Sequence, residues 1–173
     1  IVESKSLKIY LNSFYDKTFI KNSDVLNHIK KDLDKLTKSL TKVRFLNKFL
    51  DTPASIDLNS SNLLNTPKNK IICFTGFRSI CPVTSQPDFA NIYIKSSEPI
   101  ETKWITEYLK SYKEKGDFHE QCVESIYQDI ASRYNPKKIE VCGRFMRRGG
   151  IDINPIRSST KLSTFKNFRF FNQ

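Results

Sequence analysis

The sequence predicts an α+β fold built from two similar modules in tandem, each an antiparallel sheet covered on one face by two helices. Three observations lead to this prediction: an internal repeat, an amphipathic helical pattern after each copy of the repeat, and alternating strand patterns after those helices. At 173 residues, the chain is long enough for one large domain or two small ones.

The internal repeat pairs ESKSLKIYLNSFYDK, residues 3–17, with ETKWITEYLKSYKEK, residues 101–115. This density of matches indicates a duplication, and a first helix is expected in each copy. The identical pairs are Glu3/Glu101, Lys5/Lys103, Tyr10/Tyr108, Leu11/Leu109, Ser13/Ser111 and Lys17/Lys115, and the similar pairs are Ser4/Thr102, Leu7/Ile105, Phe14/Tyr112 and Asp16/Glu114.

A second helix is predicted after each copy, because apolar residues recur there at every third or fourth position. In the first copy this helix covers residues 23–40, with Ser23 as its N-cap. In the second copy it covers residues 119–134 and ends at Asn135 and Pro136. The apolar faces consist of Leu26, Ile29, Leu33, Leu36 and Leu40 in the first copy, and of Cys122, Val123, Ile126, Tyr127 and Ile130 in the second.

Strands are predicted on both sides of these helices. Residues 41–49 and 137–145 follow the helices, and a turn at RRGG leads from the latter stretch into residues 151–156. The second copy also has an opening pair of strands, near residues 70–75 and 91–95, which the first copy lacks. The alternating residues are Val43 and Phe45; Ile139, Val141 and Phe145 against Glu140, Cys142 and Arg144; and Ile151 and Ile153 against Asp152 and Asn154.

The same patterns suggest where the modules begin and end. We expect residues 1–49 to be the C-terminal part of a first module, residues 50–69 a linker rich in Ser, Asn, Pro and Asp, and residues 70–173 a complete second module. Because the first module lacks its opening hairpin and the chain starts at Ile1 rather than at Met, further residues are expected upstream.

The net charge of +11 has two interpretations. It can be a solvated, lysine-rich surface, or it can attract an anionic partner such as RNA or a phosphorylated cofactor. The basic residues are spread along the chain without interleaved aromatic residues, which favours the solvated surface. No apolar run approaches the roughly 18 residues of a membrane span, and no signal peptide is visible. The four cysteines contain no C-x-x-C pair, so free thiols in a reducing cytoplasm are expected.

The loop ICPVTSQPDF places a thiol and an acid at the start of a predicted strand. Cys81 lies directly before Pro82, whose fixed φ stiffens the loop, and Asp88 follows seven residues after the thiol. A thiol beside an acid can attack an electrophilic carbon and protonate the atom bonded to it. The alternative is a small buried cysteine and an aspartate that forms a turn.

His119 and Glu120 open the second helix of the complete module, where backbone N–H groups point outward. A carboxylate there can accept two parallel hydrogen bonds from an edge like that of guanine, or it can simply stabilise the helix dipole. His119 and Cys122 are also three residues apart, so with Cys81 they could bind zinc.

The chain contains neither G-x-G-x-x-G nor G-x-x-x-x-G-K-[ST], so a nucleotide is not expected in a Rossmann or Walker loop. The turn RRGG, together with Ser4 and Lys5, could instead bind phosphate through guanidinium, ammonium and backbone N–H groups. A basic β-turn without a ligand is the alternative.

Four motifs span nearly the whole chain: ESKSLK at residues 3–8, CPVTSQPDF at 81–89, FHEQC at 118–122 and RRGGIDINP at 147–155. In this combination and order they resemble the NADPH-dependent 7-cyano-7-deazaguanine reductases, the nitrile reductases of queuosine biosynthesis, in their two-module branch. The resemblance implies tandem tunnelling-fold modules, which assemble around barrel-like sheets and place their sites at module interfaces. A homodimer is therefore expected.

By this resemblance, Cys81 is the nucleophile that forms a covalent thioimide with the nitrile carbon, Asp88 is the proton donor, and His119 is a further catalytic residue. Two hydrides from two NADPH molecules then take the nitrile to the primary amine, 7-aminomethyl-7-deazaguanine. The implied substrate-binding residues are Val2, Glu3, Ser4, His119 and Glu120, and the implied NADPH-binding residues are Ser4, Lys5, Arg148 and Gly149.

Two other functions are weighed against the reductase. One is a zinc-dependent enzyme of the pterin-cyclohydrolase type, for which a metal assay decides. The other is a non-catalytic RNA-binding module, which predicts that RNA binding depends steeply on salt and not on Cys81. The reductase interpretation implies a small-molecule substrate, with no membrane and no direct nucleic-acid partner.

Overall fold

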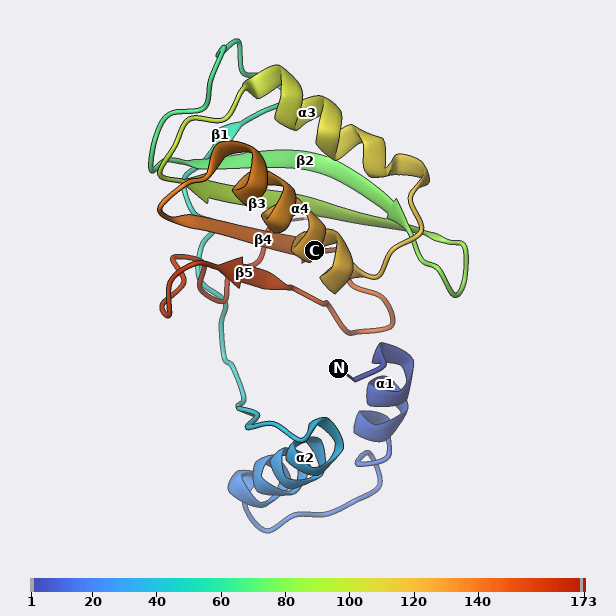
Figure 1. Ribbon diagram of the computed structural model, residues 1–173. Helices are drawn as coiled ribbons and strands as arrows, with labels where there is room; N and C mark the ends of the chain where they lie inside the picture. The colour runs from blue at the N-terminus through green and yellow to red at the C-terminus, as the bar shows by residue number, and fades with distance from the viewer. Residues whose placement is uncertain (1, 172) are drawn as a thin grey trace. The chain divides into compact units, whose positions relative to one another are not determined.

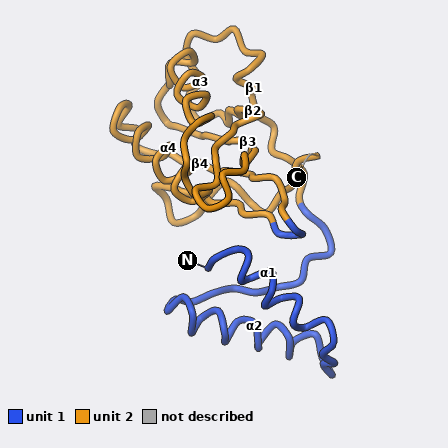
Figure 2. The backbone as a smooth tube through the Cα atoms, turned by 90° about the vertical axis from the view of Figure 1, so that its right-hand side faces the viewer, with its two compact units in different colours: residues 1–49, 149–151 blue, residues 50–148, 152–173 orange. Residues whose placement is uncertain are grey.

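The computed structural model describes residues 2–171 and 173, and it divides into two compact units. Unit 1 comprises residues 1–49 and 149–151, and unit 2 comprises residues 50–148 and 152–173 (Figure 2). Among the helices of the described residues, none combines the length and the apolar character that a membrane span requires. The elements are α1 (Ser4–Asn12), α2 (Asn22–Thr37), β1 (Ile56–Asp57), β2 (Ile71–Ile80), β3 (Pro87–Ser96), α3 (Thr102–Lys110), the 3₁₀ helix η1 (Ser111–Glu114), α4 (His119–Tyr134), β4 (Ile139–Phe145) and β5 (Ile156–Ser158).

Unit 2 is a five-stranded sheet in the order β1-β2-β3-β4-β5, with α3 and α4 on one face (Figure 1). This arrangement confirms the predicted α+β class. The sheet is antiparallel from β2 to β5, but the short β1 pairs with β2 in parallel, so the sheet is mixed rather than wholly antiparallel. The core beneath the helices is formed by Ile105 and Leu109 of α3, Val123, Ile126 and Ile130 of α4, and sheet residues that include Phe77, Ile92 and Ile94.

The other face of the sheet is covered by the C-terminal segment. Phe165 and Phe168 pack there against Cys73, Tyr93 and Cys142. Every residue of β4 is consequently buried, although its sequence alternates between apolar and polar residues. The polar side of that alternation therefore faces protein rather than water.

Several strand predictions are confirmed and two are wrong. The opening pair and the strand at 137–145 exist as β2, β3 and β4. Residues 41–49 contain no strand, because the described part of unit 1 has no neighbouring strand to which their backbone could hydrogen-bond. The final strand is not at residues 151–156 but begins at Ile156, since Pro155 has no N–H to donate to a ladder.

A β-bulge in β2 decides which side chains face the helices. The register shifts between Phe74 and Phe77, so one extra residue lies on β2, and Gly76 adopts φ of +73° there. Phe74 before the bulge and Phe77 after it both lie in the core beneath the helices. Side chains alternate along a strand, so the bulge puts the odd-numbered residues that follow it on this face.

Unit 1 has the two helices of the repeat. Its helices match those of unit 2 in length, nine residues for α1 and α3 and sixteen for α2 and α4. Equivalent hydrogen bonds join each pair: the Tyr10 hydroxyl donates to Asp32 and the Tyr108 hydroxyl donates to Asp129. Within α1 and α2, all of whose residues are described, none is buried. The duplication therefore extends to tertiary contacts.

Residues 50–69, expected to be a linker, belong to unit 2. They include β1, and Leu58 is buried in the core of this unit. The division of the chain into two tunnelling-fold modules stays a prediction.

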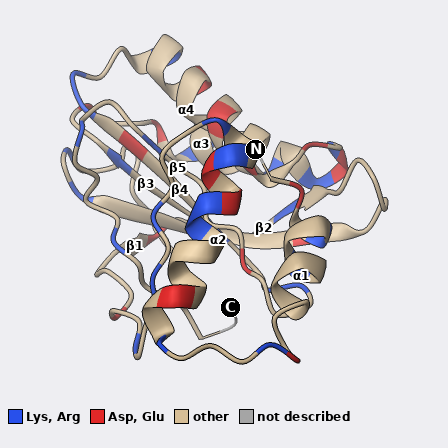
Figure 3. Ribbon diagram, turned by 90° about the horizontal axis from the view of Figure 1, so that it is seen from below, with Lys and Arg blue, Asp and Glu red and all other residues tan. Residues whose placement is uncertain are grey.

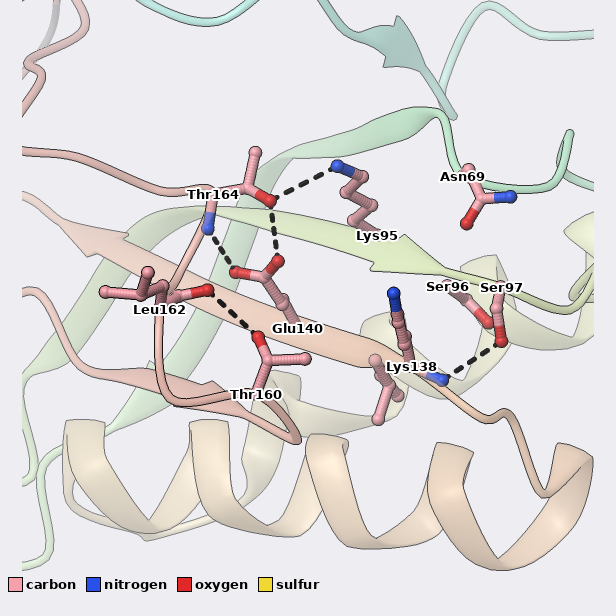
Figure 4. A pocket seen from close by; sticks show the side chains of 10 residues that line it. Asn69, Lys95, Ser96, Ser97, Lys138, Glu140, Thr160, Leu162 and Thr164 are labelled. Carbon is pink, nitrogen blue, oxygen red and sulfur yellow. Dashed lines mark hydrogen bonds between the residues drawn. The ribbon is translucent and has the colours of Figure 1, made fainter.

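The buried carboxylate of Glu140 holds the C-terminal segment (Figure 4). It accepts hydrogen bonds of 2.6 Å from the Ser163 hydroxyl, the Thr164 N–H and the Thr164 hydroxyl. Burial raises the pKa of Glu140, but these hydrogen bonds and the charge of Lys95 outweigh it and leave the pKa below the ordinary value of 4.5. The ionised form is thus favoured in the folded state.

We expect Glu140→Gln to lower the free energy of unfolding at pH 7 by about 1–3 kcal/mol, because three donors lose their charged acceptor. A depressed folded-state pKa contributes stability above the unfolded-state pKa, and that contribution is lost as the pH falls through the folded value. The difference between the parent and the variant should therefore shrink below about pH 4.5, as measured by urea unfolding. Glu98→Gln, which removes a partly exposed partner of Lys68, is the control with little effect; a gap that grows in acid would contradict this role of Glu140.

Candidate active site

Asp88 is a buried carboxylate near the start of β3. It pairs with Ser79 of β2 and lies on the side of β3 that faces the helices, as do Ala90 and Ile92. Its side chain is only 6% exposed and has two cationic or proton-bearing partners. Oδ1 lies 2.8 Å from Nη2 of Arg148, and Oδ2 lies 3.1 Å from Nε2 of His119. A carboxylate is tolerated in this position because both of its oxygens are engaged.

His119 is the first residue of α4, so the start of that helix carries it to Asp88. Its ring stacks on Phe145 with centroids 3.9 Å apart and an interplanar angle of 16°. Phe145 is the last residue of β4 and also contacts Phe77 edge to face. The imidazole is therefore fixed by an apolar plane on one side and by a carboxylate at Nε2.

Cys81 lies at the mouth of the β2–β3 hairpin, half-buried. Its N–H donates to the carbonyl oxygen of Gln86 at 2.9 Å, and its own carbonyl oxygen accepts from the Ser85 N–H at 2.9 Å. The alternation after the bulge runs through Phe77 and Ser79 to Cys81, so the thiol is directed to the side of the sheet on which Asp88 lies.

The loop after Cys81 stabilises its thiolate. Burial raises the pKa of Cys81, and so does the nearby charge of Asp88, but hydrogen bonds from the Thr84 hydroxyl and from the N–H groups of Thr84 and Val83 lower it more. The net pKa lies below the ordinary value of 9.0. A lowered pKa and partial exposure are what a nucleophilic cysteine requires.

The other three cysteines have the opposite character. Burial raises the pKa of Cys73 to about 12 and those of Cys122 and Cys142 to about 11. All three are buried, so they behave as small apolar residues. Of the four thiols, Cys81 is the one suited to nucleophilic attack.

The zinc alternative needs Cys81, His119 and Cys122 around one ion. Within residues 2–171 and 173, no group of three or more His, Cys, Asp or Glu side chains is arranged to hold a metal ion. His119 instead contacts Asp88, and Cys122 is fully buried. The structure therefore does not assemble this set of ligands.

Glu120 lies half-buried in the first turn of α4. In the described part of the chain its carboxylate has no hydrogen-bonding or ionic partner. The remaining predicted substrate residues belong to unit 1: Val2 is half-buried, and Glu3 and Ser4 are exposed at the start of α1. Both carboxylate oxygens of Glu3 cap that helix, accepting from the N–H groups of Lys5 and Ser6 at 2.7 Å.

The predicted cofactor residues have the donor types that phosphate requires. Arg148 offers a guanidinium that is 41% exposed, and Gly149 and Gly150 follow it with φ of +58° and +88°. Lys5 adds an exposed ammonium group and Ser4 a hydroxyl at the start of α1. Guanidinium, ammonium, hydroxyl and backbone N–H groups fit a phosphorylated cofactor by chemistry.

Two features of the site were not identified as functional from the sequence. Phe145 was assigned only to the apolar face of a strand, and Thr84 only to a polar loop. The signal for Thr84 was its place in the short segment after Cys-Pro, where a turn directs N–H groups back toward the thiol. Phe145 carries no such local signal, because its ring meets His119 only through tertiary packing.

A hollow of about 390 Å³ lies elsewhere on unit 2 (Figure 4). Its lining includes Lys95, Lys138 and Glu140, and none of the predicted site residues lines it. Lys95 follows Asp88 by seven residues along β3, about 23 Å in an extended strand, and alternation puts it on the opposite face. This hollow is therefore separate from the candidate active site.

Basic and acidic residues both lie along α2 (Figure 3). Lys30 pairs with Asp34, and His28 lies 3.3 Å from Asp32, each pair four residues apart. Paired charges of both signs are typical of a solvated helix face. The interpretation of the net charge as a solvated surface is consistent with this arrangement.

Comparison with known families finds two matches. Residues 87–164 match the family described as QueF-like protein, and residues 1–45 match the one described as nitrile reductase, 7-cyano-7-deazaguanine-reductase N-term. The crystal structure of the archaeosine synthase QueF-Like in the apo form aligns with a TM-score of 0.49 at 15% identity, over 57% of this chain and 99% of that one.

Curated relatives match over nearly the whole chain, and each is named NADPH-dependent 7-cyano-7-deazaguanine reductase. The protein of Hahella chejuensis is 34% identical over 94% of this chain and 68% of its own length. That of Buchnera aphidicola subsp. Schizaphis graminum is 36% identical over 95% and 72%. That of Coxiella burnetii (strain Dugway 5J108-111) is 33% identical over 100% and 69%.

Proposed function

The chain belongs to the family of the NADPH-dependent 7-cyano-7-deazaguanine reductases, and from that premise we propose that it reduces the nitrile of 7-cyano-7-deazaguanine through a covalent adduct on Cys81. The product is the primary amine 7-aminomethyl-7-deazaguanine, a precursor in queuosine biosynthesis. One observation carries the proposal: the single thiol with a lowered pKa lies on the face of the sheet that holds the buried Asp88–His119 pair.

Base recognition is assigned to the start of α4. Glu120 has a half-buried carboxylate without a protein partner, and such a group can accept hydrogen bonds from the N–H and NH₂ groups of a guanine-like edge. By family membership, Val2, Glu3 and Ser4 are proposed as further base-binding residues. For Glu3 this role requires its carboxylate to leave the N-terminus of α1, which it caps in the structure.

The first chemical step is the addition of the Cys81 S–H across the nitrile. Sulfur bonds to the nitrile carbon, the proton of the thiol passes to the Asp88 carboxylate, and Asp88 delivers it to the nitrile nitrogen. The result is a thioimide with no net change in oxidation state. His119 holds Oδ2 of Asp88 and is itself held by Phe145, so the acid is positioned before the base arrives.

The reduction then needs two hydrides and two protons to reach the amine, and the first hydride allows the C–S bond to break and free Cys81. NADPH supplies the hydrides when it is bound. Ser4, Lys5, Arg148 and Gly149 are proposed to bind its phosphate groups, for which their donors are suited. The residues of the chain bind and orient the two reactants and move the protons.

Intact-mass analysis tests the proposal. The full chain is mixed with 7-cyano-7-deazaguanine in the absence of NADPH, and a mass gain equal to the whole base is expected because addition expels no atom. Cys81→Ala should show no gain, since no other thiol has a lowered pKa. Cys73→Ala is the matched control and should retain the adduct.

The absence of a mass gain in the parent, or its persistence in Cys81→Ala, would overturn the covalent scheme. Loss of the adduct in Cys73→Ala as well would show that the mass gain reports folding rather than chemistry, so the thermal unfolding of all three proteins is recorded alongside.

A further inference from the structure

Arg148 has one set of partners in the structure and a different one in the proposed function. The proposed function gives its guanidinium to the phosphate groups of the cofactor, whereas in the structure Nη2 lies 2.8 Å from Oδ1 of Asp88. The same guanidinium donates to the carbonyl oxygen of Pro87, and through Nη1 to Oε1 of Gln86 at 3.2 Å. Arg148 is therefore attached to the start of β3 at three points.

These contacts occupy the catalytic acid. Asp88 has two oxygens, and Arg148 holds Oδ1 while His119 holds Oδ2. Each oxygen keeps a further lone pair, but the two contacts hold the carboxylate in place and restrict its approach to the Cys81 thiol and to a nitrile nitrogen. Withdrawal of one of the two partners would let the carboxylate turn more freely toward these groups.

Arg148 is the partner that can withdraw. His119 is 13% exposed and fixed by its stack on Phe145, whereas the Arg148 side chain is 41% exposed and comes from a stretch, residues 146–150, that is exposed throughout. Two glycines at positive φ follow it, and residues 146–150 lie outside the named strands. A phosphate group in solvent can compete for such a guanidinium, because it accepts the same forked hydrogen bonds as a carboxylate.

We propose that Arg148 is a positioning residue shared between Asp88 and the cofactor: phosphate draws the guanidinium off Oδ1, so the acid is available in a larger fraction of the molecules when the cofactor is in place. This inference rests on the proposed function for the assignment of Arg148 to the cofactor. It makes Asp88 and the cofactor phosphate competitors for one group, so binding of NADP⁺ reports the competition without any chemical turnover.

A double-mutant cycle on NADP⁺ binding tests the inference in the full chain. Calorimetry measures the dissociation constant for the parent, Asp88→Asn, Arg148→Met and the double variant. Asp88→Asn should tighten NADP⁺ binding about fivefold, because the competing carboxylate is gone. Arg148→Met should weaken binding about tenfold, and Asp88→Asn should then add no further change.

Two further variants sharpen the test. Arg147→Met removes the neighbouring exposed cation, which has no partner among the described residues, and in that background Asp88→Asn should still tighten binding about fivefold. Gln86→Ala removes one anchor of Arg148 on an exposed loop, without touching a buried group, and should tighten binding two- to threefold.

Three outcomes would overturn the inference: no NADP⁺ binding by the parent, no tightening in Asp88→Asn and Gln86→Ala, or equal tightening by Asp88→Asn with and without Arg148. The cycle uses no cyano base, so its result is separable from that of the adduct experiment. A protein that shows the predicted cycle but forms no adduct would refute the covalent scheme and leave the sharing of Arg148 intact.

Discussion

Asp88→Asn is expected to slow formation of the Cys81 adduct by about 10²–10⁴-fold, the range typical of a lost general acid. An amide can neither accept the proton of the thiol nor deliver one to the nitrile nitrogen, so the addition has no relay. The change keeps the shape of a residue that is 5% exposed and paired with Ser79 across the sheet, so the fold should tolerate it. Stopped-flow mixing with the cyano base measures the rate of adduct formation. Reversible base binding is measured by equilibrium titration of Cys81→Ala with and without Asp88→Asn, since neither protein can form the adduct.

Base binding should change by less than threefold, because Glu120 and not Asp88 is assigned to the base edge. Glu114→Gln is the control: its carboxylate is 78% exposed and lies 3.5 Å from Arg78, and among the described residues it contacts neither Asp88 nor His119. Losses of equal size in adduct rate and base affinity would show that Asp88 binds the base rather than moving a proton.

Phe145→Ala is expected to lower the free energy of unfolding by about 3–5 kcal/mol, the cost typical of deleting a buried aromatic ring. Phe145 is 1% exposed, meets Phe77 at 6.2 Å in an edge contact, and stacks on His119. The deletion therefore opens a cavity in the core and removes the plane that orients the imidazole. Urea unfolding measures the first effect, and the adduct rate under folding conditions measures the second.

The solvent-exposed ring of Phe171 supplies the comparison, since Phe171→Ala should change stability by less than 0.5 kcal/mol. Phe145→Leu separates the two effects, because it fills part of the cavity but cannot stack. We expect it to recover much of the stability while the adduct still forms slowly. Full recovery of both by leucine would mean that the ring does not position His119.

The helices could be predicted well because their signal is local. Apolar residues recur along α4, and Asn135 with Pro136 ends it at the predicted residue. The repeat predicted the matching pair α1 and α2, and the structure adds that Tyr10 and Tyr108 each donate a hydrogen bond to an aspartate on the next helix. The strands were less predictable, because a strand such as 41–49 forms only when another strand lies beside it, and sequence alternation does not reveal the partner.

For the site residues, too, the sequence determined some features and the tertiary structure the others. Amino-acid type and spacing determined that Cys81 and Asp88 flank a stiff loop and that His119 opens a helix, and the family motifs assigned their roles. Only the tertiary structure decided that His119 contacts Asp88 and that the charge of Asp88 acts on the Cys81 thiol. The extra residue at Gly76 reverses the alternation of β2 and turns Cys81 to the face of Asp88, and the packing of α4 on that face brings His119 to the same carboxylate. Register and packing depend on contacts between residues far apart in the chain, which is why no local pattern contains them.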